Sequence, residues 1–152
     1  MPYLIDGHNL IPYIPGLSLD QIDDEMALVD KLAPFFQTIR KKAVVYFDQA
    51  FPGSQTRMNR GNLSLCFIRS PRTADEAILS DLARLGGDAK NFTVVTSDNT
   101  LRALVQGAGV RVISGEQFAR ILTGKKAEKH EEESNGDVEY WLRLFEKRPK
   151  NS

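Results

Sequence analysis

Five short apolar runs, most of them separated by segments with helical periodicity, constrain the fold of this chain more than any other feature. Each run is rich in β-branched or aromatic residues and is bounded by polar or turn residues, which is typical of β-strands. The runs lie at residues 3–5, 43–47, 63–68, 92–96 and 110–113. Strands that alternate with helices usually form a mostly parallel sheet with helices on both faces. The pattern therefore predicts an α/β domain.

Helix signals predict four helices, at residues 20–39, 73–85, 98–107 and 114–124. The first contains Pro34, so it is either two helices or one kinked helix. The second and fourth begin with capping boxes, at Thr73 and Ser114. Gly86 and Gly124 mark their ends. The link between the second and third strands, QAFPGSQTRMNRGN, predicts a loop, so the direction of the third strand stays open.

The 152-residue chain suits one domain, which we place at residues 1–124. Residues 125–136 are charged and polar, and predict a linker or helix extension. Residues 137–152 form a tail in which Val138, Trp141, Leu142 and Phe145 would share one helix face. That face is expected to fold back onto the domain or to dock on a partner. The pattern leaves the oligomeric state open.

The charge and the composition of the sequence argue against several classes of protein. The formal net charge is +0, so any binding of a polyanion must come from a local patch. The single cysteine, Cys66, lies in an apolar run and predicts a buried, reduced thiol. The sequence shows no signal peptide and no run near the ~20 apolar residues that a membrane span needs. We therefore expect a cytoplasmic protein without a membrane partner.

Aspartates follow three of the predicted strands, at Asp6, Asp48 and Asp98. Ligands of open parallel sheets bind at the carboxyl ends of the strands, near the point where strand order reverses. Asp75, in the first turn of the second helix, would add a fourth carboxylate if that helix starts at the same edge. Such acids repel one another unless a hard cation such as Mg²⁺ or Mn²⁺ binds them. The pattern predicts a metal-assisted phosphodiester chemistry at this edge.

Each of these residues also has a purely structural interpretation. Asp48 and Asp98 could serve as turn or helix-capping residues. Asp75 would be favourable at any helix N-terminus, and Glu76 fits the capping box better than a ligand set. The functional hypothesis therefore depends on all four aspartates sharing one edge.

Short motifs next to these acids supply candidate supporting groups. In DGHN, Gly7 would permit an unusual turn after the strand. Asn9 could then hydrogen-bond Asp6, contact a phosphate or cap a turn. His8 is disfavoured as a general base, because most turn geometries point it away from its neighbours. Ser97 could position Asp98 or donate to a phosphate.

Basic residues concentrate between positions 40 and 72, with seven Lys or Arg against one acid, Asp48. Four of them could hold a nucleic-acid backbone against the acidic edge. These are Arg57 and Arg60 in the predicted loop, and Arg69 and Arg72 before the capped helix. The alternative is an ordinary solvated surface.

The motifs DGHNL, VVYFD, TADEAI and VVTSDN, in this order, resemble the NYN subgroup of PIN-like nucleases, and most closely its YacP-type bacterial family. The resemblance covers about residues 2–124. It implies a Rossmann-like three-layer α/β/α sandwich with a mostly parallel central sheet of about five strands. It also implies a Mg²⁺- or Mn²⁺-dependent endoribonuclease that acts on RNA, which we expect to be single-stranded, with the ribosome as a possible partner.

Carried over by position, the resemblance assigns metal binding to Asp6, Asp75 and Asp98, and the motif's Asn to Asn9. Asp48 and Glu76 become supporting acids, and Ser97 and Asn99 flank Asp98 as supporting residues. Some NYN enzymes carry a further acid where this chain has Arg102, which leaves the number of metal ions open. Cleavage of DNA stays open as well.

Two other functions compete with the endoribonuclease. A catalytically silent RNA- or ribosome-binding module could keep the same fold, although the intact acid set counts against it. A small-molecule phosphohydrolase or nucleotide-binding domain is disfavoured by the lack of a G-x-G-x-x-G motif or P-loop.

Overall fold

A computed structural model describes residues 2–17, 24–48 and 57–124 of the chain. The predicted linker and tail, and the start of the first predicted helix, lie outside the described residues. Within them the elements follow one another as β1 (Tyr3–Asp6), α1 (Gly7–Leu10), η1 (Ile11–Tyr13), α2 (Asp24–Ile39), β2 (Ala43–Phe47), β3 (Arg57–Arg60), β4 (Leu63–Phe67), α3 (Ala74–Leu85), η2 (Gly86–Asn91), β5 (Thr93–Val95), α4 (Asn99–Gly107), β6 (Arg111–Ile113) and α5 (Gly115–Thr123).

The strands form one six-stranded sheet in the order β3-β4-β2-β1-β5-β6. Every neighbouring pair is parallel except β3 and β4. The central register places Ile5 opposite both Val45 and Val95. The third predicted strand is β4, and it runs parallel to β2. The α/β prediction is therefore confirmed, with one more strand than expected.

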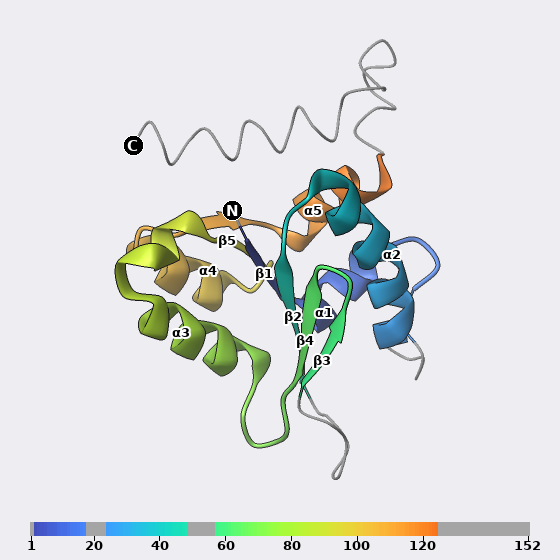
Figure 1. Cartoon of the computed structure of the whole chain (residues 1–152). Coiled ribbons are helices and arrows are strands. Elements are labelled where there is room, and N and C mark those ends of the chain that lie inside the picture. The colour runs from blue at the N-terminus through green and yellow to red at the C-terminus, as the bar shows by residue number, and fades with distance from the viewer. Residues whose placement is uncertain (1, 18–23, 49–56, 125–152) are drawn as a thin grey trace.

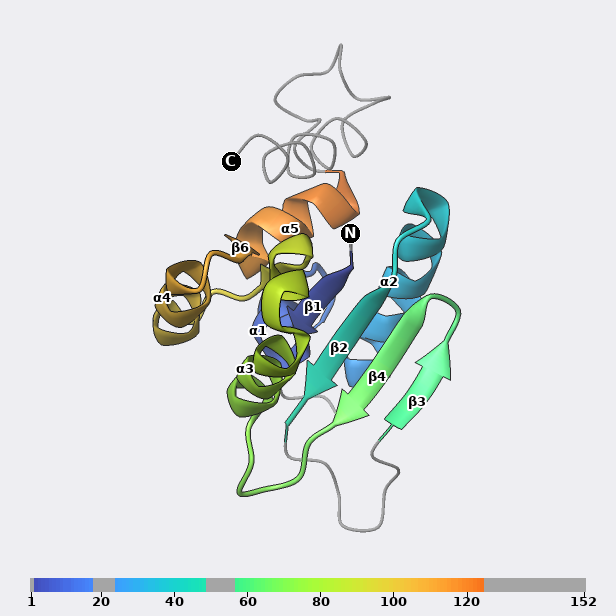
Figure 2. The same ribbon diagram turned by 60° about the vertical axis from the view of Figure 1, so that its left-hand side comes forward.

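Helices cover both faces of the sheet, which makes three layers (Figures 1 and 2). Successive strand residues point to opposite faces, so Ile5 packs in the core under α2 and α5, whereas Leu4 packs in the core under α3 and α4. The first core contains Phe36 and Phe118, and the second contains Ile78. None of the described helices is both long and apolar enough to span a bilayer.

The predicted helix boundaries are confirmed where local capping chemistry sets them. Thr73 and Ser114 both form the reciprocal side-chain and backbone hydrogen bonds of a capping box. α3 ends at Leu85, directly before Gly86. Pro34 lies inside α2, so the described part of the first predicted helix is one element across the proline.

The prediction of a loop between the second and third strands is wrong for residues 57–60. They form β3, an edge strand that pairs with β4 through its backbone. All its side chains are exposed, so it lacks the apolar alternation that identifies a strand. Arg60 pairs with Leu63, which leaves Gly61 and Asn62 as a two-residue hairpin loop. That Gly-Asn pair is the signal by which the hairpin could have been found.

Strand order reverses at β1. The chain steps outward through β2 and β4 on one side of β1 and through β5 and β6 on the other. In an open parallel sheet such a reversal opens a crevice at the carboxyl ends of the two strands that flank it. The corresponding place here is beyond the ends of β1 and β5, where Asp6 ends β1 and residues 96–98 follow β5, and we call it the acidic edge.

Candidate active site

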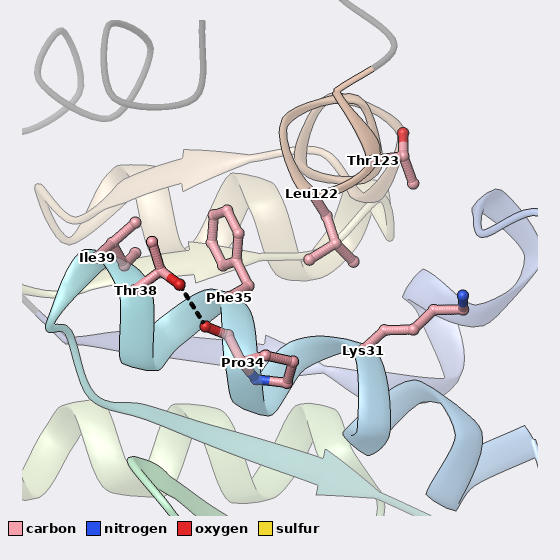
Figure 3. Close-up of a pocket in the computed structure, with 7 residues that line it drawn as sticks. All are labelled: Lys31, Pro34, Phe35, Thr38, Ile39, Leu122 and Thr123. Carbon is pink, nitrogen blue, oxygen red and sulfur yellow. Dashed lines mark hydrogen bonds between the residues drawn. The ribbon is translucent and has the colours of Figure 1, made fainter. Parts of the chain in front are cut away.

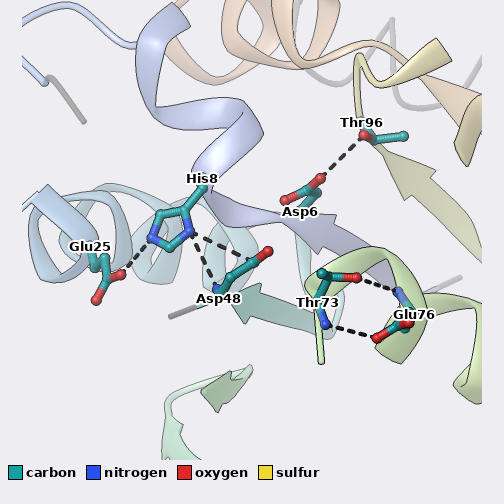
Figure 4. A network of polar contacts seen from close by, with 7 residues as sticks. All are labelled: Asp6, His8, Glu25, Asp48, Thr73, Glu76 and Thr96. Atoms are coloured by element: carbon teal, nitrogen blue, oxygen red, sulfur yellow. Dashed lines mark hydrogen bonds and ion pairs between the residues drawn. The ribbon is translucent and has the colours of Figure 1, made fainter. Parts of the chain in front are cut away.

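Asp6 is the last residue of β1 at the acidic edge, and only 7% of its surface is exposed. Burial first, and then the nearby charges of Asp75 and Asp48, raise the pKa of its carboxyl group from 3.8 to about 7. A hydrogen bond from the backbone of Asn9 and the charge of His8 act in the opposite direction. Thr96 Oγ1 lies 3.4 Å from Asp6 Oδ2 and donates to it (Figure 4). The carboxyl group of Asp6 is therefore poorly solvated and lies close to other acids.

Asp48 follows β2 and faces His8, which lies on α1 (Figure 4). His8 lowers the pKa of Asp48, and a backbone hydrogen bond from Ala74 at the start of α3 lowers it as well, against the effect of burial. This bond ties the end of β2 to the N-terminus of α3. Within the part of the chain that the structure describes, Asp48 Oδ1 is buried without a hydrogen-bond partner.

His8 bridges two acids from different elements. Its Nε2 lies 2.5 Å from Glu25 Oε2 on α2, and its Nδ1 lies 3.8 Å from Asp48 Oδ1. Asp48 and then Glu25 raise the pKa of His8 to about 9, although burial lowers it. Asp48 has the larger influence on this pKa, but 3.8 Å is too long for a hydrogen bond. By distance, therefore, we assign the tight ion pair to His8 and Glu25.

The expectation that His8 points away from its neighbours is wrong. α1 begins directly after β1, so it turns the imidazole back over the end of β2. The Asp48 backbone N–H lies 3.3 Å from His8 Nδ1, so a neutral ring would accept from it. Glu25 had no signal in the sequence, because its role depends on how α2 packs against α1. The ion pair of His8 and Glu25 therefore lies next to Asp48 and holds the imidazole beside its carboxylate.

Asp75 lies in the first turn of α3, next to Ala74, whose backbone bonds Asp48 at the acidic edge. Burial raises the pKa of its carboxyl group, and the charges of Asp98, Asp48 and Glu76 raise it further. Asp75 also raises the pKa of Asp6. It is therefore within electrostatic range of all three other predicted acids. The structure thus brings the four aspartates to one edge of the sheet rather than scattering them over different faces.

Asp98 and Glu76 have capping functions in addition. Asp98 Oδ1 accepts the backbone N–H of Leu101 at 2.9 Å and caps α4, and Asn99 is the exposed first residue of that helix. Glu76 Oε1 accepts the backbone N–H of Thr73 at 3.1 Å (Figure 4). The structural interpretation of Glu76 as the capping-box acid is confirmed. For Asp98, capping occupies one carboxylate oxygen.

Asn9 connects the segments that follow β1 and β5 at the acidic edge. Its Oδ1 accepts the backbone N–H of Ser97 at 2.5 Å, and Ser97 Oγ accepts the backbone N–H of Gly115 at 2.9 Å. Thr96 Oγ1 accepts the N–H of Asp98 at 3.1 Å. Asn9 therefore contacts Asp6 through its backbone, and its side chain fixes the loop that carries Asp98.

The prediction that Gly7 permits an unusual backbone turn is wrong. Gly7 is absent from the described residues with positive φ. A Cβ atom there would overlap the ring of Phe47 and approach Tyr46 O to 3.0 Å. Gly7 is thus required for the close packing of α1 on β2.

Carboxylate oxygens are the ligands that Mg²⁺ and Mn²⁺ prefer. The raised pKa values of Asp6 and Asp75, and the Oδ1 of Asp48 that is buried without a hydrogen bond, are what a site for such a cation would show. The donor chemistry therefore fits. As the described side chains stand, however, no group of three or more His, Cys, Asp or Glu forms a ready coordination set. Metal binding stays a prediction.

The predicted basic cluster is divided by the sheet. Arg57 and Arg60 lie in β3 rather than in a loop. Arg60 pairs with Asp30 of α2 at 2.5 Å, whereas Arg57 lies with Arg72 at a hollow under α3. Arg69 lies in the segment before α3, exposed like Arg72. These four arginines therefore do not form one surface.

A second hollow, of about 560 Å³, lies between α2 and α5 (Figure 3). Its lining residues are Lys31, Pro34, Phe35, Thr38, Ile39, Leu122 and Thr123. None of these is an acid, and none belongs to the acidic edge around Asp6. The candidate site is therefore the acidic edge and not this mainly apolar hollow.

Comparison with known proteins gives consistent matches. Residues 3–144 match the family model of the YacP-like NYN domain. The chain is 25% identical over 122 residues to the "Uncharacterized protein YacP" of Bacillus subtilis (strain 168), which covers 77% of this chain and 72% of that protein.

Two solved structures share the fold. The crystal structure of Rae1 (YacP) from Bacillus subtilis is similar with a TM-score of 0.68 and 23% identity, over 99% of this chain and 95% of that one. The structure of a mutant of the same protein has a TM-score of 0.63 and 24% identity, over 86% and 77% of the two chains.

Proposed function

The chain belongs to the YacP-like NYN domain family, and from this premise we propose that it is a divalent-metal-dependent endoribonuclease. The family and the shared fold support a nuclease-type domain. The observation that carries the proposal is the convergence of Asp6, Asp48, Asp75 and Asp98 at the point where strand order reverses. There, the pKa of Asp6 is raised to about 7.

In this proposal the carboxylates of Asp6, Asp75 and Asp98 hold Mg²⁺ or Mn²⁺. When bound, such an ion would polarise a phosphodiester and lower the pKa of an attacking water. The choice of these three acids follows from their positions. Asp6 is the most buried of them, and Asp75 interacts electrostatically with the other two.

The remaining residues position these acids. The ion pair of His8 with Glu25 places a positive charge beside Asp48 and Asp6. Asn9 and Thr96 hold the loop after β5, so that Asp98 stays at the acidic edge. With the acids fixed in this way, less side-chain entropy is lost when a phosphate binds.

The proposed substrate is single-stranded RNA, with the ribosome as a possible partner and the cytoplasm as the location. This part depends on the family resemblance rather than on the geometry. The competing function is an RNA-binding module without turnover, which is favoured by the capping bonds of Asp98 and Glu76.

A cleavage assay on single- and double-stranded RNA and DNA, with Mg²⁺, Mn²⁺ or EDTA, tests the proposal. We expect cleavage of RNA that EDTA abolishes, and a loss of at least about 100-fold in Asp6→Asn and Asp98→Asn. Asp88→Asn, which changes an exposed acid of η2, is the matched control. Full activity in both site variants would reject the nuclease, and RNA binding without turnover in the wild type would support the module.

A further inference from the structure

A hollow of about 300 Å³ lies between α3 and the strands β2, β4 and β3. Its polar lining includes Tyr46, Arg57, Cys66, Arg72, Asp81 and Arg84. We call it the arginine pocket. Its arginines come from three separate segments, the edge strand β3, the segment before α3 and the last turn of α3. The fold, rather than a local run of basic residues, has therefore gathered these charges.

The single acid in this lining is already engaged. Tyr46 Oη donates to Asp81 Oδ2 at 2.6 Å, and Arg84 forms an ion pair with Asp81. The Asp81 charge thus offsets one of the three guanidinium charges and holds Arg84 in place. Arg57 and Arg72 face no further acid in the lining, so the pocket has an excess of positive charge.

The guanidinium groups act on the interior of the pocket and not only on its rim. Burial raises the pKa of Tyr46 and of Cys66, and Arg57 and Arg84 both oppose these increases. Arg57 also stands directly opposite Cys66 in the β3–β4 register. An anion in the pocket would therefore meet Arg57 and Arg84 from opposite sides, one from the sheet and one from α3.

The arginine pocket lies next to the candidate active site, because β2 and the segment that leads into α3 contribute residues to both. Tyr46 lies two residues before Asp48 on β2, and Arg72 lies three residues before Asp75. A helix rises about 1.5 Å per residue, so Asp81 lies about 9 Å along α3 from Asp75. A nucleic-acid strand bound at the acids would reach the pocket with a neighbouring nucleotide.

We propose that the arginine pocket binds an internal backbone phosphate of single-stranded RNA, next to the phosphodiester that is cleaved. This inference depends on the proposed endoribonuclease function. The planar guanidinium fork matches the oxygens of a phosphate, which makes arginine suited to this contact. The pocket would fix the direction of the strand along α3, while the acids act one or two nucleotides away.

Binding of a fluorescent single-stranded RNA, measured in EDTA over a range of salt concentrations, tests the pocket without turnover. We expect Arg57→Gln and Arg84→Gln each to weaken binding about tenfold. Each should also reduce the slope of log K against log salt by about 0.7 for each lost phosphate contact. Arg120→Gln is the matched control, because Arg120 is an exposed helical arginine paired with Glu116. Arg84→Lys keeps the charge without the fork and should bind with intermediate affinity.

The outcomes separate this inference from the proposed function. Suppose that the wild type cleaves RNA and that the Arg57 and Arg84 variants bind RNA like Arg120→Gln. The phosphate-binding role of the arginine pocket is then rejected, and the proposed nuclease function is kept. If the wild type binds RNA without cleaving it and both variants bind more weakly, the pocket does bind RNA, but its place next to a cleaved phosphodiester is overturned together with the nuclease. The wild type could instead bind 5′-phosphorylated RNA more tightly than 5′-hydroxyl RNA, and Arg84→Gln could remove this preference. That result would mean that the pocket binds a terminal phosphate, and it would overturn the proposal for an internal phosphate.

Discussion

Asn9 Oδ1 accepts the backbone N–H of Ser97 at 2.5 Å and so joins two segments that are 88 residues apart in the chain. One segment follows β1 and carries Asp6, and the other follows β5 and carries Asp98. Strand pairing brings β1 and β5 side by side, but it does not fix the loops beyond them. This hydrogen bond does so together with Thr96 Oγ1, which donates to Asp6 Oδ2 and accepts the N–H of Asp98, and these bonds set how the two acids face each other.

Asn9→Ala should impair cleavage more than it impairs RNA binding. The variant leaves the Ser97 N–H without its acceptor, which should lower the free energy of unfolding by about 1–2 kcal/mol. It should also let Asp98 move relative to Asp6, so that kcat falls while KM changes little. Steady-state kinetics and urea unfolding measure both effects. Asn91→Ala, at an exposed position of η2, is the control, and equal kinetics in the two variants would contradict the positioning role.

Asp6→Asn should stabilise the metal-free protein, and more so at high pH. The pKa of Asp6 is about 7 in the native state against an ordinary value of 3.8, so the native state retains a proton that the unfolded state releases. The Asp6 contribution to the stability of the wild type therefore falls as pH rises from about 4 to about 7. Each pKa unit is worth about 1.4 kcal/mol, so Asn should gain a few kcal/mol by pH 8.

Urea unfolding in EDTA at pH 5 and pH 8 measures this gain. Asp88→Asn should show the same stability difference from the wild type at both pH values. An Asp6→Asn variant that is equally or less stable than the wild type at pH 8 would mean that the Asp6 carboxylate is not strained by burial and by its acidic neighbours.

Much of the fold was predictable because its signals are local. The capping boxes at Thr73 and Ser114 need only residues within one helical turn, and both form as expected. The positions of Asp6, Asp48 and Asp98 after strands also follow from the pattern. β3 was missed because its exposed side chains carry no periodicity, and its pairing comes from the backbone and the Gly61 turn.

The parts of the site that were missed depend on tertiary packing. The partner of His8 is Glu25, 17 residues away, and the ion pair exists because α2 lies beside α1. The partner of the Asn9 side chain is a backbone group beyond β5. The four predicted arginines looked like one cluster in the sequence, but the pleat of β3 sends Arg57 and Arg60 to different faces. No local signal encodes these relationships.

Glu25→Gln should lower the pKa of His8 from about 9 towards 6.5. Protonated His8 contributes stability that is fully present below pH 6.5 and is lost as pH rises through about 9, so the variant should lose this contribution at lower pH. An NMR titration of the imidazole measures the pKa. The chain has two histidines, so His130→Gln identifies the His8 signal. Glu116→Gln, whose acid pairs with Arg120, should leave it unchanged. An unaltered His8 pKa in Glu25→Gln would show that Asp48 alone holds the proton.

Gly7→Ala should destabilise the protein and disturb the site, although alanine is the better helix former. Its Cβ would overlap the Phe47 ring in the core, so either α1 or β2 must shift. Overpacking of this kind costs about 1–3 kcal/mol. Because α1 carries His8 and Asn9, cleavage should fall with stability.

Gly107→Ala is the matched control for this change. A Cβ there meets nothing within 4 Å, and the position ends α4 without a positive φ. The control should therefore be neutral or stabilise by up to about 1 kcal/mol. Thermal unfolding of the two variants decides between them. Equal stability of the two variants would show that Phe47 can rotate away from Gly7. The close packing of α1 on β2 would then be rejected as the cause of the position of His8 over Asp48.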